Sequence, residues 1–228
     1  MPQTSAAADV AATPAPWTLT GRGWILLIRL PPQQLDDPRF VPDPLRGRRH
    51  GRYALMMAVD YAHSPVGPYR ELLYIPGRFD FADGRRYSIT HIYVSTQTSV
   101  VSGRRNWGIP KQRCDFSVEA APNGATHFAA QLDDGTAFAQ LELRAHGPRL
   151  PFSSAIVPGI FKTLSQLHDG YQFTYRPTAR GHVRLARVTG MAFDGRHFPD
   201  CAAGHVAACV EVTDFQMTFP VSTIIPTS

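Results

Sequence analysis

Lysine is nearly absent from this chain of 228 residues, although the chain has 23 basic side chains. Lys111 and Lys162 are its two lysines, and the other basic residues are arginines. An arginine supplies charge, but only an amine can lose its proton on desolvation and then attack a carbonyl carbon. The scarcity has two explanations at this stage. Either a general preference for arginine leaves two lysines by chance, or Lys111 serves as a nucleophile.

Cysteine is also scarce, and the three that occur follow no ligand or disulfide pattern. Cys114, Cys201 and Cys209 are odd in number and widely spaced, and the chain has neither a CxxC pair nor a Cys/His spacing suited to zinc. The nine histidines form no HExxH motif. We therefore expect reduced thiols, a cytoplasmic location and no bound metal.

Long apolar runs, nucleophile elbows and phosphate loops are missing as well. The longest apolar run near the start covers residues 24–28, which is too short to cross a bilayer. No GxSxG elbow indicates acyl transfer, and no glycine-rich loop indicates nucleotide binding. Residues 1–16 lack the basic start and apolar centre of a signal peptide, so we expect a flexible arm before a single domain at 17–228.

Positive charge is in excess, with a formal net charge of +5 and a pI near 9.4. The densest positive stretch is RGRRHGR at 46–52, a kind of cluster that can meet nucleic acid or an anionic membrane. No aromatic platform and no DNA-reading motif accompanies it, so a solvated loop or a contact between subunits is the favoured interpretation. The sequence therefore predicts neither a nucleic-acid partner nor a membrane partner.

Most of the chain has the composition of short β-strands. Runs rich in aromatic, aliphatic and β-branched residues are bounded by proline, glycine and aspartate. They lie at 17–30, 53–61, 69–75, 87–95 and 206–219. Two hairpins are also predicted, one within 116–144 around the DDGT turn at 133–136, the other pairing 171–177 with 182–193 around 179–181.

Helices are few in the predicted fold. Residues 96–106 begin with polar residues suited to a cap and end before a Gly-Ile-Pro break, and 160–168 place three apolar side chains on one helical face. The proline-rich stretch 31–44 is expected to be a surface loop. Many short strands with two brief helices predict a mainly β (α+β) fold, either a barrel or a sandwich elaborated at one end.

The segment GRRNWGIPKQ at 103–112 gives the strongest local signal of chemistry. Gly108 allows an unusual turn and Pro110 restricts the backbone, so Lys111 is expected at the head of a new strand. With Trp107 and Ile109 nearby, the amine would point into a dry cavity, where desolvation favours its neutral form. The neighbouring arginines at 104, 105 and 113 would add to this effect if they lay beside the amine.

The same segment resembles the signature of the acetoacetate decarboxylase family, in the pattern GRxxWGIPK. In that family the lysine after the proline forms a Schiff base with a β-keto acid, and no cofactor takes part. The stretch GPYRE at 67–71 is similar to the family segment that carries an active-site glutamate, which maps onto Glu71. The stretch GRGW at 21–24 resembles the early strand whose arginine lines the pocket, which maps onto Arg22.

This resemblance implies a closed, cone-like antiparallel β-barrel with a few short helices, assembled into a homo-oligomer. The chain departs from the family pattern at two positions. Gln112 stands where family decarboxylases carry a second lysine, and Met56 stands where they carry another acidic residue. With Arg22 and Trp107, these two residues are expected to contribute to the substrate-binding pocket, and Lys111 and Glu71 to the catalytic pair.

The expected function is that of a Schiff-base-forming lyase that decarboxylates a small β-keto acid such as acetoacetate. Because of Gln112 and Met56, two alternatives stay open: an imine-dependent aldolase-dehydratase acting on pyruvate-like substrates, and a non-catalytic keto-acid-binding protein. The individual residues have alternatives too. Glu71 could pair with Arg29 across strands, Arg22 could lie at the surface, and Trp107 could be core packing.

Overall fold

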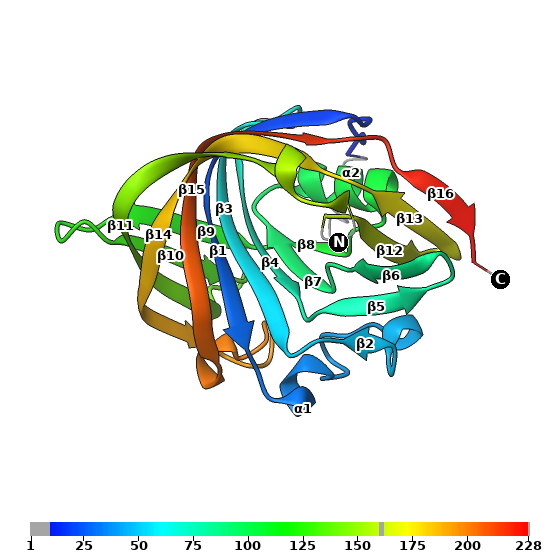
Figure 1. Cartoon of the computed structure of the whole chain (residues 1–228), viewed down its shortest axis with the longest axis horizontal. Coiled ribbons are helices and arrows are strands. Elements are labelled where there is room, and N and C mark those ends of the chain that lie inside the picture. The colour runs from blue at the N-terminus through cyan, green and yellow to red at the C-terminus, as the bar shows by residue number, and fades with distance from the viewer. Residues whose placement is uncertain (1–9, 160–161, 228) are drawn as a thin grey trace, which may run out of the picture.

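Two β-sheets make up most of the computed structural model, which describes residues 10–159 and 162–227. The larger sheet has ten strands and curls into a nearly closed barrel, and the smaller sheet has six strands and lies at one side of it (Figure 1). Helices are few and short. The mainly β fold with a barrel and a few short helices is therefore confirmed.

The ten-stranded sheet has, in spatial order, β8 (Lys111–Arg113), β7 (His91–Val94), β4 (Tyr69–Ile75), β3 (Tyr53–His63), β1 (Trp17–Arg29), β15 (His205–Phe219), β14 (Thr178–Phe193), β11 (Ala137–Ser153), β10 (Thr126–Gln131) and β9 (Asp115–Ala120). The six-stranded sheet has β16 (Thr223–Pro226), β13 (Tyr171–Tyr175), β12 (Leu164–His168), β6 (Gly84–Tyr87), β5 (Arg78–Phe81) and β2 (Arg49–His50). Among the described residues, the α-helices are α1 (Pro32–Leu35) and α2 (Gln97–Trp107), and the short 3-10 turns are η1 (Asp43–Leu45), η2 (Ser154–Ile156) and η4 (Cys201–Ala203).

The large sheet buries side chains on both faces near β1, β3 and β4, because successive residues of a strand point to opposite faces. On β3, Met56 and Ala58 point into a cluster that fills the barrel interior. Val59 and Tyr61 belong to a second cluster on the outer face. Residues of α2 and the six-stranded sheet, such as Trp107 of α2, complete that second cluster.

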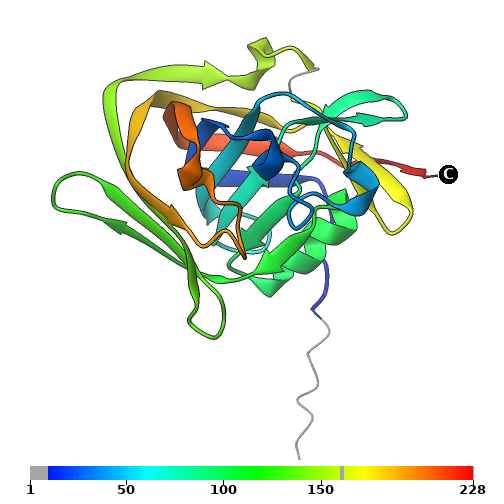
Figure 2. The same cartoon turned by 90° about the horizontal axis from the view of Figure 1, so that it is seen from below.

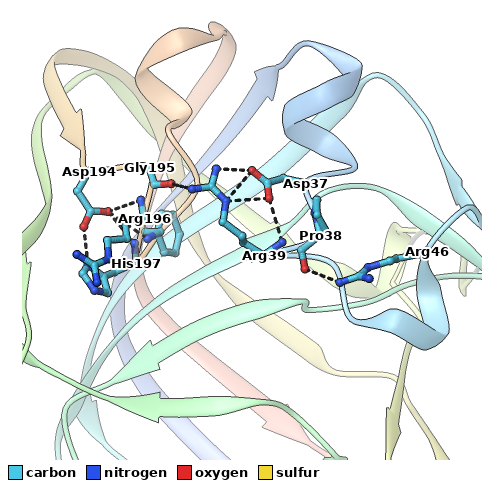
Figure 3. A network of polar contacts seen from close by, with 9 residues as sticks. Asp37, Pro38, Arg39, Arg46, Asp194, Gly195, Arg196 and His197 are labelled. Carbon is cyan, nitrogen blue, oxygen red and sulfur yellow. Dashed lines mark hydrogen bonds and ion pairs between the residues drawn. The ribbon is translucent and has the colours of Figure 1, made fainter.

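One end of the barrel is covered by α1 and by the loop before β15 (Figure 2). Polar contacts join the two segments (Figure 3). Arg39 donates to the Gly195 carbonyl oxygen at 2.8 Å and to Asp37 at 2.6 Å, while Arg46 donates to the Pro38 carbonyl oxygen at 2.9 Å. The predicted loop at 31–44 thus contains short helical turns and is bound to the fold.

The basic cluster at 46–52 is partly used inside the fold. Arg46 pairs with Asp43, and Arg49 pairs with Asp36 at 2.6 Å while its side chain is 8% exposed. Two of its arginines therefore neutralise aspartates of the neighbouring segment.

Neither α1 nor α2 has the length and apolar character needed to cross a bilayer.

Most predicted strands are confirmed, among them 17–30, 53–61, 69–75 and 206–219. The DDGT segment at 133–136 links β10 and β11 as predicted. The helix predicted at 96–106 is α2, with the same boundaries to within one residue. Each of these elements has turn residues at its ends and one periodicity of hydrophobic residues between them, and both are strong local signals in the sequence.

Two predictions were wrong. Residues 164–168 form strand β12, not a helix, because they pair with β13 across a tight turn in which Asp169 and Gly170 both have positive φ; residues 160 and 161 of that predicted helix lie outside the described residues. The hairpin around 179–181 does not form either. β14 runs straight through Gly181, which lies at a bulge against β15, where a Cβ atom would come within 2.8 Å of the Phe215 backbone.

The segment before β1 is tied to α2. The Thr13 amide donates to Ser102 Oγ at 3.0 Å, and Asn106 Nδ2 donates to the Thr13 carbonyl oxygen at 2.8 Å. Residues 1–9 of the predicted arm lie outside the described residues. The last part of that arm therefore packs beside α2, next to the first residue of β1.

A first prediction concerns Gly108, which ends α2 in the left-handed conformation with φ 64°. A Cβ atom there would come within 2.7 Å of the Phe173 ring. We expect Gly108→Ala to lower the free energy of unfolding by about 2–4 kcal/mol, since it combines backbone strain with overpacking. Urea unfolding would measure the change.

Gly124→Ala is the matched control, because Gly124 has φ 79° but no atom within 4 Å of its Cβ position. It should cost about 1 kcal/mol from the backbone alone. Equal losses in the two variants would show that contact with Phe173 contributes nothing.

Candidate active site

Lys111 is the first residue of β8, as the sequence predicted, and the α2 crossover brings it there. β7 and β8 are parallel neighbours with Ile92 opposite Lys111, so a crossover must join them, and α2 is that connection. The side chain of Thr96 caps the start of α2 by accepting from the Ser99 amide. Gly108 ends the helix and allows the chain to turn back toward the sheet.

One face of α2 is shaped to receive the Lys111 side chain. Ser99, Gly103 and Trp107 are four residues apart, so they lie on the same face of the helix. Lys111 Nζ donates to Ser99 Oγ at 3.1 Å, and a Cβ atom on Gly103 would lie 2.5 Å from Lys111 Cδ. A small residue at 103 is therefore required for the lysine side chain to pass the helix, and Trp107 completes this wall.

The Arg104 side chain binds the backbone of Lys111. Its Nε and Nη2 donate to the Lys111 carbonyl oxygen at 3.0 and 2.7 Å. Arg113 pairs with Asp115 and Asp133. These two arginines are therefore engaged by the Lys111 backbone and by aspartates, respectively.

Glu71 of β4 is the charged partner of the amine. Lys111 Nζ lies 3.2 Å from Glu71 Oε2, and the two residues are only 3% and 4% exposed. Tyr61 OH donates to the other carboxylate oxygen, Glu71 Oε1, at 3.2 Å. Glu71 thus pairs with Lys111 and not with Arg29, and both of its oxygens are engaged inside the protein.

Two buried tyrosines surround this pair. The Tyr69 ring centroid lies 5.2 Å from Lys111 Nζ, and the Tyr61 and Tyr69 rings are 4.5 Å apart. Burial, and then the charge of Glu71, raise the pKa of Tyr61 and the pKa of Tyr69 well above the usual value of a phenol. Both hydroxyls therefore stay protonated through the neutral range, and Tyr61 remains a hydrogen-bond donor to the carboxylate.

A small cavity lies against the amine, with a volume of about 10 Å³. Its walls are mostly aromatic and aliphatic, and the charged residues that line it are the paired Lys111 and Glu71. The lining consists of Trp17, Leu19, Tyr61, Tyr69, Glu71, Ile89, Ile92, Trp107, Ile109, Lys111 and Phe219. An amine and a carboxylate in such a dry, apolar place can exchange a proton, which is the chemistry that imine formation requires.

The structure brings together three of the six predicted site residues: Lys111, Glu71 and Trp107. Gln112 is exposed on β8. Met56 is buried in the barrel interior, on the opposite face of β3 from Tyr61. Arg22 is half-exposed and lies 3.5 Å from Asp60.

Sequence reasoning missed Ser99, Tyr61 and Tyr69. A signal for the tyrosines was present, because Tyr69 and Glu71 are two residues apart in a predicted strand and therefore share a face. Tyr61 comes from another strand, and no local pattern relates it to Glu71. Within 10–159 and 162–227, no group of three His, Cys, Asp or Glu residues is arranged to hold a metal ion.

Comparison with known proteins gives a family and a fold. A model of the acetoacetate decarboxylase (ADC) family matches residues 1–214. Acetoacetate decarboxylase from Legionella pneumophila superposes with a TM-score of 0.73 at 11% identity, covering 97% of this chain and 93% of that one. An acetoacetate decarboxylase-like enzyme from Sphingomonas wittichii gives 0.67 at 13% identity, covering 100% and 99%.

A third similar structure is the enduracididine biosynthesis enzyme MppR complexed with pyruvate. It gives a TM-score of 0.62 at 14% identity, covering 95% of this chain and 93% of that one. No curated protein matches the sequence. At these identities the structural similarities establish the fold.

The raised pKa of Tyr61 predicts a dependence of stability on pH. The unfolded chain ionises this phenol near pH 10, whereas the folded chain retains the proton, so stability falls as pH rises above about 10. Tyr61→Phe should make this decline shallower by about 1.4 kcal/mol per pH unit. Urea unfolding between about pH 9 and pH 11 would measure it. Tyr53→Phe, at a position 43% exposed, is the control and should leave the slope unchanged; equal slopes in all three proteins would contradict the burial of the Tyr61 proton.

Proposed function

The chain belongs to the acetoacetate decarboxylase family, and from that premise we propose that it is a carbon–carbon lyase whose Lys111 forms a Schiff base with a small β-keto acid. The observation that carries the proposal is the contact between a buried amine and a buried carboxylate, Lys111 Nζ to Glu71 Oε2, at 3.2 Å. A lysine so placed has a base within hydrogen-bond reach and is shielded from water. Both conditions favour a nucleophilic amine.

Glu71 moves the protons in this mechanism. It accepts a proton from the Lys111 ammonium, and the neutral amine then attacks the ketone carbon. Glu71 returns this proton to the hydroxyl of the resulting carbinolamine, which leaves as water, and an iminium ion with the new carbon–nitrogen bond remains on Lys111. Tyr61 donates to Glu71 Oε1 and so keeps the other oxygen, Oε2, directed at the amine.

The charges in the cavity favour decarboxylation. The lining contains one cation and one anion, so a substrate carboxylate would add a second negative charge to a mostly apolar space. Loss of CO2 sends the bonding electrons into the iminium ion and gives a neutral enamine, which removes that extra charge. Glu71, protonated again from solvent water, then delivers a proton to the enamine carbon, and water hydrolyses the resulting iminium ion to release a ketone and the Lys111 ammonium.

Two other functions stay as alternatives. The fold is similar to that of MppR, which has been solved with pyruvate and with the condensation product of pyruvate and imidazole 4-carboxaldehyde. An enamine on Lys111 could likewise attack an aldehyde, so an aldolase-dehydratase is the second candidate. Gln112, in place of a second lysine, keeps a non-catalytic keto-acid-binding protein as the third.

Borohydride trapping at Lys111 tests the proposal. The protein is incubated with acetoacetate, or with pyruvate and an aldehyde, then reduced and mapped by mass spectrometry. We expect an adduct on Lys111 that is lighter than the acetoacetate adduct by the mass of CO2, together with release of CO2. An adduct that retains the carboxylate would favour binding without turnover, and a condensation product would favour the aldolase.

The chain provides its own control, because Lys162 is the one other lysine. Its amine donates to the Ser154 carbonyl oxygen at 2.7 Å. Lys111→Met should abolish both the adduct and CO2 release, and Lys162→Met should retain both. Labelling of Lys162 at the same rate as Lys111, or no adduct with any keto acid, would overturn the proposal.

Glu71→Gln tests the proton transfer separately. The amide keeps the shape of the side chain but cannot accept the ammonium proton, so we expect kcat to fall by about 10²–10⁴. Steady-state assay of CO2 release would measure it. Glu119→Gln, at an exposed position on β9, is the control. Activity in Glu71→Gln equal to that of the control would remove Glu71 from the mechanism.

A further inference from the structure

The cavity beside Lys111 is too small for its proposed substrate as it stands. Its volume of about 10 Å³ corresponds to about one water molecule. Any ketone that reaches the amine must therefore displace a wall of the cavity. The wall residue that is displaced at the lowest free-energy cost determines which substrates fit.

Trp17, like Leu19 and Phe219, lines the cavity from the end of a β-ladder, and it is the largest of these three residues. It is the first residue of β1, and it pairs with Phe219, the last residue of β15. Pairing of β1 with β3 begins only at Thr20, so Trp17 has a strand on one side alone. Tyr61 and Glu71, in contrast, lie on strands with a neighbour on each side. The end of a ladder opens at lower free energy than its middle.

The indole of Trp17 is held by the segment before β1 and not by the sheet. Its Nε1 donates to the carbonyl oxygens of Thr13 and Pro14 at 3.3 and 3.1 Å. Its ring packs edge-on against Trp107, with the centroids 5.1 Å apart. Trp107 is fixed in turn, because its Nε1 donates to the Pro220 carbonyl oxygen at 2.7 Å.

We propose that Trp17 is the specificity-determining residue of this site, limiting the substrate to a short β-keto acid with an apolar substituent. The inference rests on the proposed function. The substituent is apolar because the lining beyond the Lys111–Glu71 pair is aromatic and aliphatic. It is short because a longer chain requires a larger displacement of Trp17, which is 1% exposed and packs against Trp107.

Trp24 provides a matched control for a test of this role. It is also a tryptophan of β1 and is also 1% exposed, but it belongs to the cluster inside the barrel. Trp17 belongs to the outer cluster that contains the cavity wall. Trp17→Phe and Trp24→Phe therefore remove the same atoms from the same strand, on its two opposite faces.

The experiment compares acetoacetate with 3-oxohexanoate, two β-keto acids that differ by two methylenes. We expect Trp17→Phe to raise the ratio of kcat/KM for 3-oxohexanoate to that for acetoacetate by roughly 10-fold or more, because a methylene in an apolar pocket is worth about 10–200-fold. Trp24→Phe should keep the ratio of the unchanged protein. The rate of borohydride trapping at Lys111 gives a second readout of the same selectivity.

Leu19→Ala is a second variant, for use if Trp17→Phe does not fold. Leu19 lines the cavity from the same strand and is 1% exposed; its truncation should shift the ratio in the same direction. An unchanged ratio in the folded variants, or an equal shift in Trp24→Phe, would overturn the role of Trp17 while leaving Schiff-base chemistry intact. Absence of any Lys111 adduct in the unchanged protein would instead overturn the proposed function, and the specificity inference with it.

Discussion

The contact between Lys111 and Glu71 is the interaction on which the site depends. Each of these charges would be costly to bury alone, because a low-dielectric interior does not solvate an isolated ion. Placed 3.2 Å apart, with Ser99 accepting from the amine and Tyr61 donating to the carboxylate, they compensate each other. The same arrangement gives a proton donor and a proton acceptor that water does not reach. The contact between Lys111 and Glu71 thus compensates two buried charges and also places a proton donor beside a proton acceptor.

The large sheet can hold this pair because it is covered on both faces. Its inner face fills the barrel, and its outer face near β4 and β7 is covered by α2 and the six-stranded sheet. The crossover from β7 to β8 places the helix directly over Lys111. Gly103 leaves room for the lysine side chain, and Gly108 turns the chain back to the sheet. Gly103 and Gly108 therefore both help to place the Lys111 amine.

The segments before β1 and after β15 meet at the same site. The segment before β1 contacts α2 through Thr13, and the segment after β15 contacts it through Pro220, which accepts from Trp107. Trp17 and Phe219, opposite each other at the end of the β1–β15 ladder, line the cavity. Glu71 lies on β4, inside the large sheet, whereas Lys111 lies on β8, at the edge of that sheet.

The sequence by itself determined the strands with clear ends, the helix predicted at 96–106 and the place of Lys111 at the head of a strand. Each of these depends on neighbours within a dozen residues: a cap at Thr96, a turn at 133–136, a proline before Lys111. It did not separate the two faces of β3, so Met56 was predicted for the pocket although it lies in the barrel interior. It also could not assign Gly181 to a bulge or relate Tyr61 to Glu71, since both depend on which strands pair and in what register. Local propensity is encoded within a segment, but strand register and burial are settled only when distant segments pack into the same core. For that reason the tertiary structure alone decided which side chains surround the Lys111 amine.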